Sequence, residues 1–136
     1  MSVLEPVDEL PINTGDDVVR VRQAVRARAS AARLSLVDQT KLITAASELA
    51  RNTLVHGGSG MARVETVQRE GRRGVKAVFT DSGPGIPDVE KALTDGYTTG
   101  SGLGLGLGGS RRLVDEFVLE TAVGHGTTVT VIKWTR

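Results

Sequence analysis

A glycine-rich segment divides this chain and limits where its regular structure can lie. More than half of the 17 glycines fall between Gly83 and Gly109. Glycine weakens the interiors of helices and strands, and two prolines in the same segment remove backbone donors. We therefore expect no regular structure in DSGPGIP, and a glycine-rich loop over residues 95–110 that runs into a helix. With 136 residues in total, we expect a single domain over residues 1–136.

Composition excludes several classes of protein. Cysteine is absent and only two histidines are present, which rules out disulfides, thiol catalysis and multi-histidine metal centres. A net charge of +1 and an aromatic content of 3% give no basis for a nucleic-acid stacking surface. No apolar run approaches the roughly 20 residues that cross a bilayer, and the acidic start MSVLEPVDELP does not look like a signal peptide. We therefore expect a cytoplasmic protein.

Hydrophobic periodicity predicts helices and strands on both sides of the glycine-rich segment. Valines spaced i, i+3 and i+7 give the first helix its apolar face, and Ser35 with Asp38 fits a capping box at the second. Pro11 confines the first strand to a sheet edge or a strand end. The predicted elements, in chain order, are a strand at 7–12, helices at 16–32 and 38–56, strands at 61–68 and 75–80, a short helix at 88–93, a helix ending near Glu116, and strands at 117–123 and 127–134. The strand pairs that follow helices favour an α+β two-layer sandwich, with a mixed, mostly antiparallel sheet and helices on one face.

Charge is distributed unevenly along the first predicted helix. Five acidic residues precede the first basic one, and five arginines then follow with no acid among them: Arg20, Arg22, Arg26, Arg28 and Arg33. This basic stretch is either a solvated helix face or a surface for an acidic partner or polyanion.

The segment SELARN places Glu48 and Asn52 four residues apart, on one face of the second helix. A carboxylate can accept a proton. An amide oxygen suits Mg²⁺, which needs only one or two protein oxygens beside nucleotide phosphates and water. An exposed polar pair on an amphipathic helix is the alternative interpretation.

The segment DSGPGIP follows a predicted strand and begins with Asp81. Gly83 and Gly85 would let a ligand approach the backbone closely, and an ionised Asp81 would accept a hydrogen bond from an exocyclic amine. Adenine carries such an amine where guanine presents an oxygen, so the pattern favours adenine; a plain strand-to-loop turn is the alternative. Thr127 opens the last strand, and its hydroxyl could hydrogen-bond a base or a water beside Asp81.

Glycines at 102, 104, 106 and 108 recur at every second position before a predicted helix. Backbone amides at a helix N-terminus bind phosphate, so the pattern predicts a flexible lid with glycine hinges; a mobile linker is the alternative. The match to G-x-G-x-x-G is false, because no strand precedes it and no βαβ unit surrounds it. The P-loop motif and the signatures of eukaryotic-type kinases are missing.

The order of these motifs resembles the GHKL superfamily of ATPases and kinases over residues 38–134. The segments SELARN, DSGPGIP, DGYTTGSGLGLGL, RRLVDEF and IKW are similar to the RsbT-like serine/threonine kinases of bacterial partner switching, which serve stressosomes in stress signalling. The resemblance implies a Bergerat-type fold that binds Mg²⁺ and ATP beneath a flexible lid.

Residue roles follow from this resemblance. It implies that Glu48 is the catalytic base, that Asn52 is the Mg²⁺ ligand and that Asp81 reads the adenine amine. The other nucleotide-binding residues that it implies are Gly83, Gly85, Thr98, Thr99, Gly102, Gly104 and Thr127. The lid of this chain is shorter than in relatives such as SpoIIAB and lacks their charged insert.

The resemblance also implies partners. The substrate would be a STAS-domain antagonist protein similar to RsbS or RsbR, and the released kinase would activate an RsbU-like phosphatase. An anti-sigma factor similar to RsbW or SpoIIAB, which mainly binds a sigma factor, is the alternative. A sensor histidine kinase is not expected, since no dimerisation helix carries a phospho-accepting histidine; His56 should end the second helix and His125 should lie in a turn. We expect no nucleic-acid or membrane contact.

Overall fold

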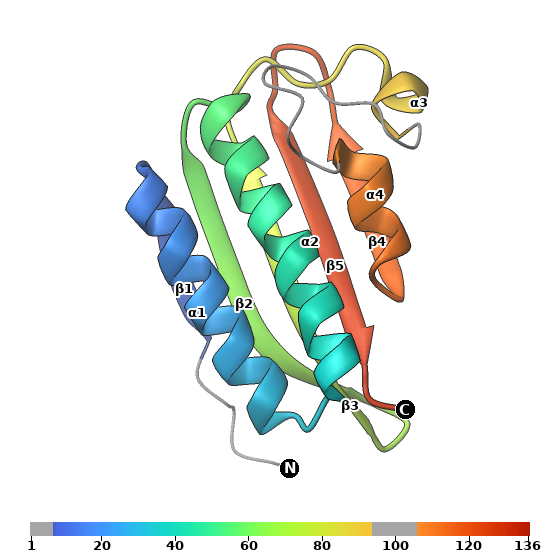
Figure 1. The fold of residues 1–136 in the computed structure, drawn as a ribbon. Coiled ribbons are helices and arrows are strands. Elements are labelled where there is room, and N and C mark those ends of the chain that lie inside the picture. The colour runs from blue at the N-terminus through green and yellow to red at the C-terminus, as the bar shows by residue number, and fades with distance from the viewer. Residues whose placement is uncertain (1–6, 94–105) are drawn as a thin grey trace.

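The computed structural model describes residues 7–93 and 106–136. They form a five-stranded sheet with helices on one face (Figure 1). The strands are β1 (Asp8–Ile12), β2 (Gly60–Arg69), β3 (Arg72–Asp81), β4 (Glu116–Thr121) and β5 (Thr127–Trp134). The helices are α1 (Gly15–Ala31), α2 (Leu36–Val55), α3 (Val89–Ala92) and α4 (Gly106–Arg112). The two-layer α+β architecture is confirmed, and all strand pairs among the described residues are antiparallel.

The strand order is β1-β2-β3-β5-β4, which leaves β1 and β4 at the two edges of the sheet. Pro11 therefore lies in an edge strand, as predicted, where a missing backbone donor is tolerated. Because β5 inserts between β3 and β4, the end of β3 meets the beginning of β5. None of the described helices combines the length and the apolar character that a membrane span requires.

One hydrophobic core fills the space between the helices and the sheet. The helices contribute fully buried residues such as Val21 and Leu42, and the strands contribute Val75 and Phe79. Side chains alternate between the faces of a strand, so every second residue of β3 points into this core. The same alternation places Asp81, two residues beyond Phe79, on the helix-covered face.

Both long helices start with N-caps, but only the first has a complete capping box. At α1, Thr14 Oγ1 accepts the backbone N–H of Asp17, and the Asp17 carboxylate accepts the N–H of Thr14. At α2, Ser35 accepts the N–H of Asp38 at 3.1 Å, which is half of the predicted box. The buried carboxylate of Asp38 instead lies 3.6 Å from Lys133 Nζ, so a tertiary ion pair replaces the local return bond.

The predicted end of the last helix near Glu116 is wrong. Helix α4 ends at Arg112, and Glu116 begins β4. The Asp115 N–H donates to the Ile132 carbonyl at 3.0 Å, and the Asp115 carboxylate accepts the N–H of Trp134 at 2.7 Å. Pairing with β5 therefore ends the helix, although RRLVDEF by itself continues a helical pattern.

Arg33 ends α1 with a left-handed backbone, at φ 67°. Its N–H donates to Ser30 and the N–H of Leu34 donates to Ala29, the pattern of a Schellman motif. Glycine is favoured at this position because a Cβ strains the left-handed conformation.

We expect Arg33→Gly to stabilise the fold. Relief of backbone strain should outweigh the added entropy of the unfolded chain, and the free energy of unfolding should increase by about 0.5–1 kcal/mol. The thermal midpoint should then rise by roughly 2–4 °C. Arg26→Gly, inside α1, is the matched control and should lower the midpoint. A lower midpoint for Arg33→Gly would contradict the assignment of strain.

Trp134 packs against the face of the sheet that lacks helices. Its Nε1 donates to Glu116 Oε2 at 2.6 Å, and Arg69 reaches the same carboxylate at 2.7 Å. The Arg69 guanidinium also lies 4.8 Å from the centre of the indole ring. A Cβ on Gly74 would meet the ring at 2.6 Å, so glycine is needed for this close packing. The Trp134 hydrogen bond, and then Arg69, hold the pKa of Glu116 below its usual value.

Acid should destabilise the protein in part through Glu116. Its pKa is lower in the folded state than the ordinary value of 4.5, so its stabilisation is complete above that value. It is lost as the pH falls below 4.5 and through the lower folded pKa. The midpoint of thermal unfolding, followed by fluorescence of the single tryptophan, should decrease as the pH is lowered below that value. Glu116→Gln keeps an acceptor but does not titrate, so its midpoint should fall less; an equal fall in both proteins would contradict the prediction.

Candidate functional site

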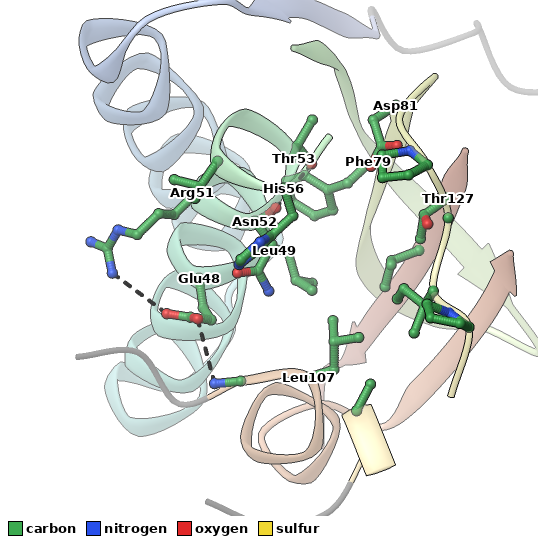
Figure 2. A pocket seen from close by; sticks show the side chains of 18 of the residues that line it. Glu48, Leu49, Arg51, Asn52, Thr53, His56, Phe79, Asp81, Leu107 and Thr127 are labelled. Atoms are coloured by element: carbon green, nitrogen blue, oxygen red, sulfur yellow. Dashed lines mark hydrogen bonds and ion pairs between the residues drawn. The ribbon is translucent and has the colours of Figure 1, made fainter. Parts of the chain in front are cut away.

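A pocket of about 590 Å³ opens between α2, the adjoining ends of β3 and β5, the loop after β3 and the start of α4. Its apolar lining comes mainly from Leu49, Phe79, Ile86, Leu107 and Val129. The size and the apolar character suit a small organic ligand held by a few polar groups. Figure 2 shows these polar groups arriving from separate elements, with Glu48 and Asp81 in different parts of the pocket.

Helix α2 supplies Glu48 and Asn52, and both line the pocket. Glu48 is only 8% exposed and Asn52 is half-buried, so the two do not form an exposed polar pair. Glu48 Oε2 accepts the backbone N–H of Gly106 at 3.4 Å, and Oε1 lies 3.5 Å from Arg51 Nη1 (Figure 2). Both carboxylate oxygens are thus held by donors, one from α4 and one from the same turn of α2.

Asp81 and Thr127 are direct partners in the β3–β5 register, so both lie at the same end of the sheet. Asp81 Oδ1 accepts the N–H of Gly83 at 2.9 Å. Among residues 7–93 and 106–136, no hydrogen bond engages Asp81 Oδ2. The loop therefore orients the carboxylate and leaves one oxygen for a ligand.

Two glycines bring neighbouring backbone against Asp81. A Cβ on Gly57, just beyond α2, would lie 2.4 Å from the Asp81 Cγ. A Cβ on Gly126, at φ +83°, would lie 2.1 Å from the Asp81 carbonyl oxygen. No side chain fits at either position, so the end of α2 and the β4–β5 turn enclose this aspartate through glycine.

The loop after β3 is pinned to the β4–β5 turn. The Ile86 N–H donates to Thr121 Oγ1 at 3.0 Å, and Thr121 Oγ1 lies 2.9 Å from Thr127 Oγ1. Gly85 has φ +78°, and a Cβ there would meet the Ala122 carbonyl oxygen at 2.3 Å. Glycine thus allows the close approach, and Thr121 links the Ile86 wall to the Thr127 hydroxyl.

Of the six predicted site residues that the structure describes, five line the same pocket. The pocket is lined by Glu48, Asn52, Asp81, Gly85 and Thr127. Gly83 does not line it but holds Asp81 through its backbone N–H. Four predicted residues lie outside the described part of the chain: Thr98, Thr99, Gly102 and Gly104.

Sequence reasoning missed other residues of the pocket. Arg51 and His56 line it from α2, and Asp88 and Lys91 line it from the region of α3. His56 does cap α2, as predicted, but it also faces the pocket. A signal for Arg51 and His56 was present, since they stand three and eight residues after Glu48 and so share its side of the helix. Thr121 had no such signal, because strand pairing alone brings it to Thr127.

The side-chain oxygens of α2 are too few to hold a magnesium ion by themselves, but they would suit one that also binds the phosphates of a nucleotide. No group of three or more acidic or histidine side chains in the described residues could hold a metal. Asn52 offers one neutral oxygen, with the Glu48 carboxylate four residues away on the same helix. Mg²⁺ commonly binds with so few protein ligands when phosphates and water complete its octahedron.

Comparison with known protein families gives one clear match. A family described as "Histidine kinase-like ATPase domain" matches residues 13–133. The chain is 45% identical over 125 residues to serine/threonine-protein kinase RsbT of Bacillus subtilis, covering 92% of this chain and 94% of that protein. It is 32% identical over 103 residues to an anti-sigma F factor of Geobacillus stearothermophilus, covering 71% and 69%.

Solved structures share the fold at lower sequence identity. The RsbU and RsbW domains of a Mycobacterium tuberculosis protein align with a TM-score of 0.67 and 20% identity, covering 97% of this chain and 33% of that one. A mycobacterial sensor histidine kinase, MprB, aligns with a TM-score of 0.53 and 21% identity, covering 95% and 99%. These likenesses support the fold of the domain.

Proposed function

This chain belongs to the family of histidine kinase-like ATPase domains and, within it, to the partner-switching serine/threonine-protein kinases, and we propose that it phosphorylates a STAS-domain antagonist protein. One observation supports the proposed ATP-dependent phosphoryl transfer. A single apolar pocket has Glu48 and Asn52 of α2 in one part and Asp81, at the end of β3, in another. We propose that residues 1–136 act as one ATP-binding domain in the cytoplasm.

The Asp81 end of the pocket is proposed to bind adenine. Asp81 Oδ2 would accept a hydrogen bond from the exocyclic amine, while Oδ1 keeps its bond to Gly83. Phe79 and Ile86 provide apolar contacts for the base. Thr127, held by Thr121, would bind the base or a water beside Asp81. Guanine would place an oxygen against the carboxylate, which explains a preference for ATP.

The Glu48 end is proposed to carry out phosphoryl transfer. Asn52 would hold Mg²⁺, which neutralises charge on the phosphate oxygens when it is bound. The serine or threonine oxygen of the substrate would form a bond to the γ-phosphorus while the bond from that phosphorus to the bridging oxygen of ADP breaks. Glu48 would take the hydroxyl proton, and the pocket would position the reactants.

The partners are proposed from the kinship with RsbT. The STAS-domain substrate would be similar to RsbS or RsbR, and the released kinase would activate an RsbU-like phosphatase. An anti-sigma factor is the second candidate, favoured by the 32% identity to an anti-sigma F factor. Both candidates use the same ATP chemistry, so the partner and not the pocket distinguishes them.

The decisive experiment identifies the phosphorylated partner. The chain is incubated with Mg²⁺, ATP and each purified STAS-domain protein and sigma factor of the source organism, and phosphosites are mapped by mass spectrometry. Phosphorylation of a STAS-domain protein on serine or threonine would support the switch kinase. Stable binding of a sigma factor in the presence of ATP would instead support the anti-sigma factor, with kinase activity secondary.

A further inference from the structure

The outer surface of α1 and the start of α2 is basic and is not used by the pocket. From Val18 to Ser47 the only acidic residue is Asp38, and it is buried against Lys133. The two helices lie side by side over the sheet, so their exposed sides form one continuous surface (Figure 1). We call this surface the basic face and define it by six exposed residues: Arg22, Arg26, Arg33, Leu36, Val37 and Lys41.

The cations of the basic face differ from other arginines nearby in having no partner among the described residues. Arg20 pairs with Asp17 at 2.6 Å, and Arg28 pairs with Asp8 at 3.0 Å. No hydrogen bond or ion pair within residues 7–93 and 106–136 engages the side chains of Arg22, Arg26, Arg33 or Lys41. Two arginines of α1 are thus paired with carboxylates, whereas the positive charges of the basic face are left available to a binding partner.

Two aliphatic side chains lie among these charges. Leu36 is 80% exposed and Val37 is 64% exposed. Arg33 precedes Leu36 by three residues, and Lys41 follows Val37 by one helical turn. Exposed apolar side chains next to charge of a single sign are the arrangement expected of a site that binds an amphipathic segment of opposite charge.

Arg33 provides a further observation. It occupies the left-handed position that glycine fills with less strain, yet its long cationic side chain points to no partner within the described residues. A strained backbone conformation is often associated with a functional site. The strain at Arg33 is therefore consistent with a role for its side chain outside the fold.

We propose that the basic face docks an acidic, amphipathic segment of a partner protein. Carboxylates of that segment would meet the cations, which begin at Arg22, about 14 Å before the end of α1, and an apolar side chain would cover Leu36. A nucleic acid fits less well, because the face has no aromatic side chain and the net charge is only +1. A membrane surface also fits less well, because α1 buries its apolar side, including Val21 and Val25, against the sheet.

The test uses a defined probe. A labelled helical peptide about five turns long, with leucines on one face and glutamates on the others, is titrated into the ATP-saturated protein at about 0.15 M salt. Fluorescence anisotropy gives the affinity, and backbone amide shifts locate the site. We expect shifts in residues 19–41 and binding that weakens with added salt. A peptide with lysine in place of glutamate, a DNA duplex and phosphatidylserine vesicles serve as competing probes.

Variants separate docking from folding and from ATP binding. Arg22→Gln with Arg26→Gln should weaken peptide binding roughly threefold to tenfold, and Arg33→Gly should weaken it while raising the thermal midpoint. Arg63→Gln removes the same charge from the opposite face of the sheet and is the matched control, with no expected change. ATP affinity should be equal in all of these variants, so the result is independent of the proposed chemistry. The proposal would be overturned if the acidic peptide did not bind or if the variants bound it as tightly as the wild type. It would also be overturned by amide shifts outside residues 19–41, or by tighter binding of DNA or vesicles.

Discussion

Replacing Glu48 with glutamine is expected to slow phosphoryl transfer by about 10²–10⁴-fold while ATP binds as before. Glutamine keeps the shape of the side chain and one acceptor for the N–H of Gly106, so α4 should stay in place. It cannot take up the proton of the attacking hydroxyl, so only the chemical step should suffer. ATP affinity is measured by calorimetry, and transfer is measured as phosphate incorporated into the protein substrate.

The control for Glu48→Gln is Glu65→Gln, which removes a carboxylate from β2, outside the pocket. This variant should transfer phosphate at the wild-type rate. Unchanged transfer in Glu48→Gln would overturn the assignment of the base. Loss of both ATP binding and transfer would show that Glu48 contributes mainly to the structure of the site.

Replacing Asp81 with asparagine is expected to weaken ATP binding by about tenfold to a hundredfold, since a hydrogen bond to a charged group contributes about 1.5–3 kcal/mol. Asparagine has a single acceptor oxygen, but the site needs one for Gly83 and a second for the adenine amine. The amide nitrogen of asparagine would face that amine as a second donor. The same nitrogen could donate to the oxygen of guanine, so the preference for ATP over GTP should shrink.

Asp88→Asn is the matched control for Asp81→Asn. Asp88 also lines the pocket, and its side chain caps α3 by accepting the N–H of Lys91 at 3.0 Å. Asparagine is an equally good N-cap, so this variant should keep both the fold and the nucleotide preference. Binding constants for ATP and GTP are compared in the two variants. An unchanged ratio of the two constants in Asp81→Asn would contradict the role of Asp81 in reading the base.

Local patterns predicted the elements whose buried side follows a simple period. The spacing of valines predicted α1 to within one residue at each end, and alternation predicted β5 as it is found. Each of these elements has one face in the core, so the spacing of its apolar residues in the sequence matches the period of a helix or a strand. The pattern around Asp115 was misleading, because the segment is helical by composition. Its backbone donor instead pairs with the Ile132 carbonyl across a distance in sequence that no local pattern reveals.

The sequence by itself determined the two-layer fold, the pairing of Glu48 with Asn52 on one helix face, and the position of Asp81 at the end of a strand. These follow from periodicity, which acts over a few residues. Only the tertiary structure decided that Gly57 and Gly126 enclose Asp81, that Gly106 holds Glu48, and that Arg33 and Lys41 belong to one surface. The reason is physical: such contacts depend on how β5 inserts beside β3 and how α1 lies against α2, and this packing minimises the free energy of the whole chain rather than of any segment.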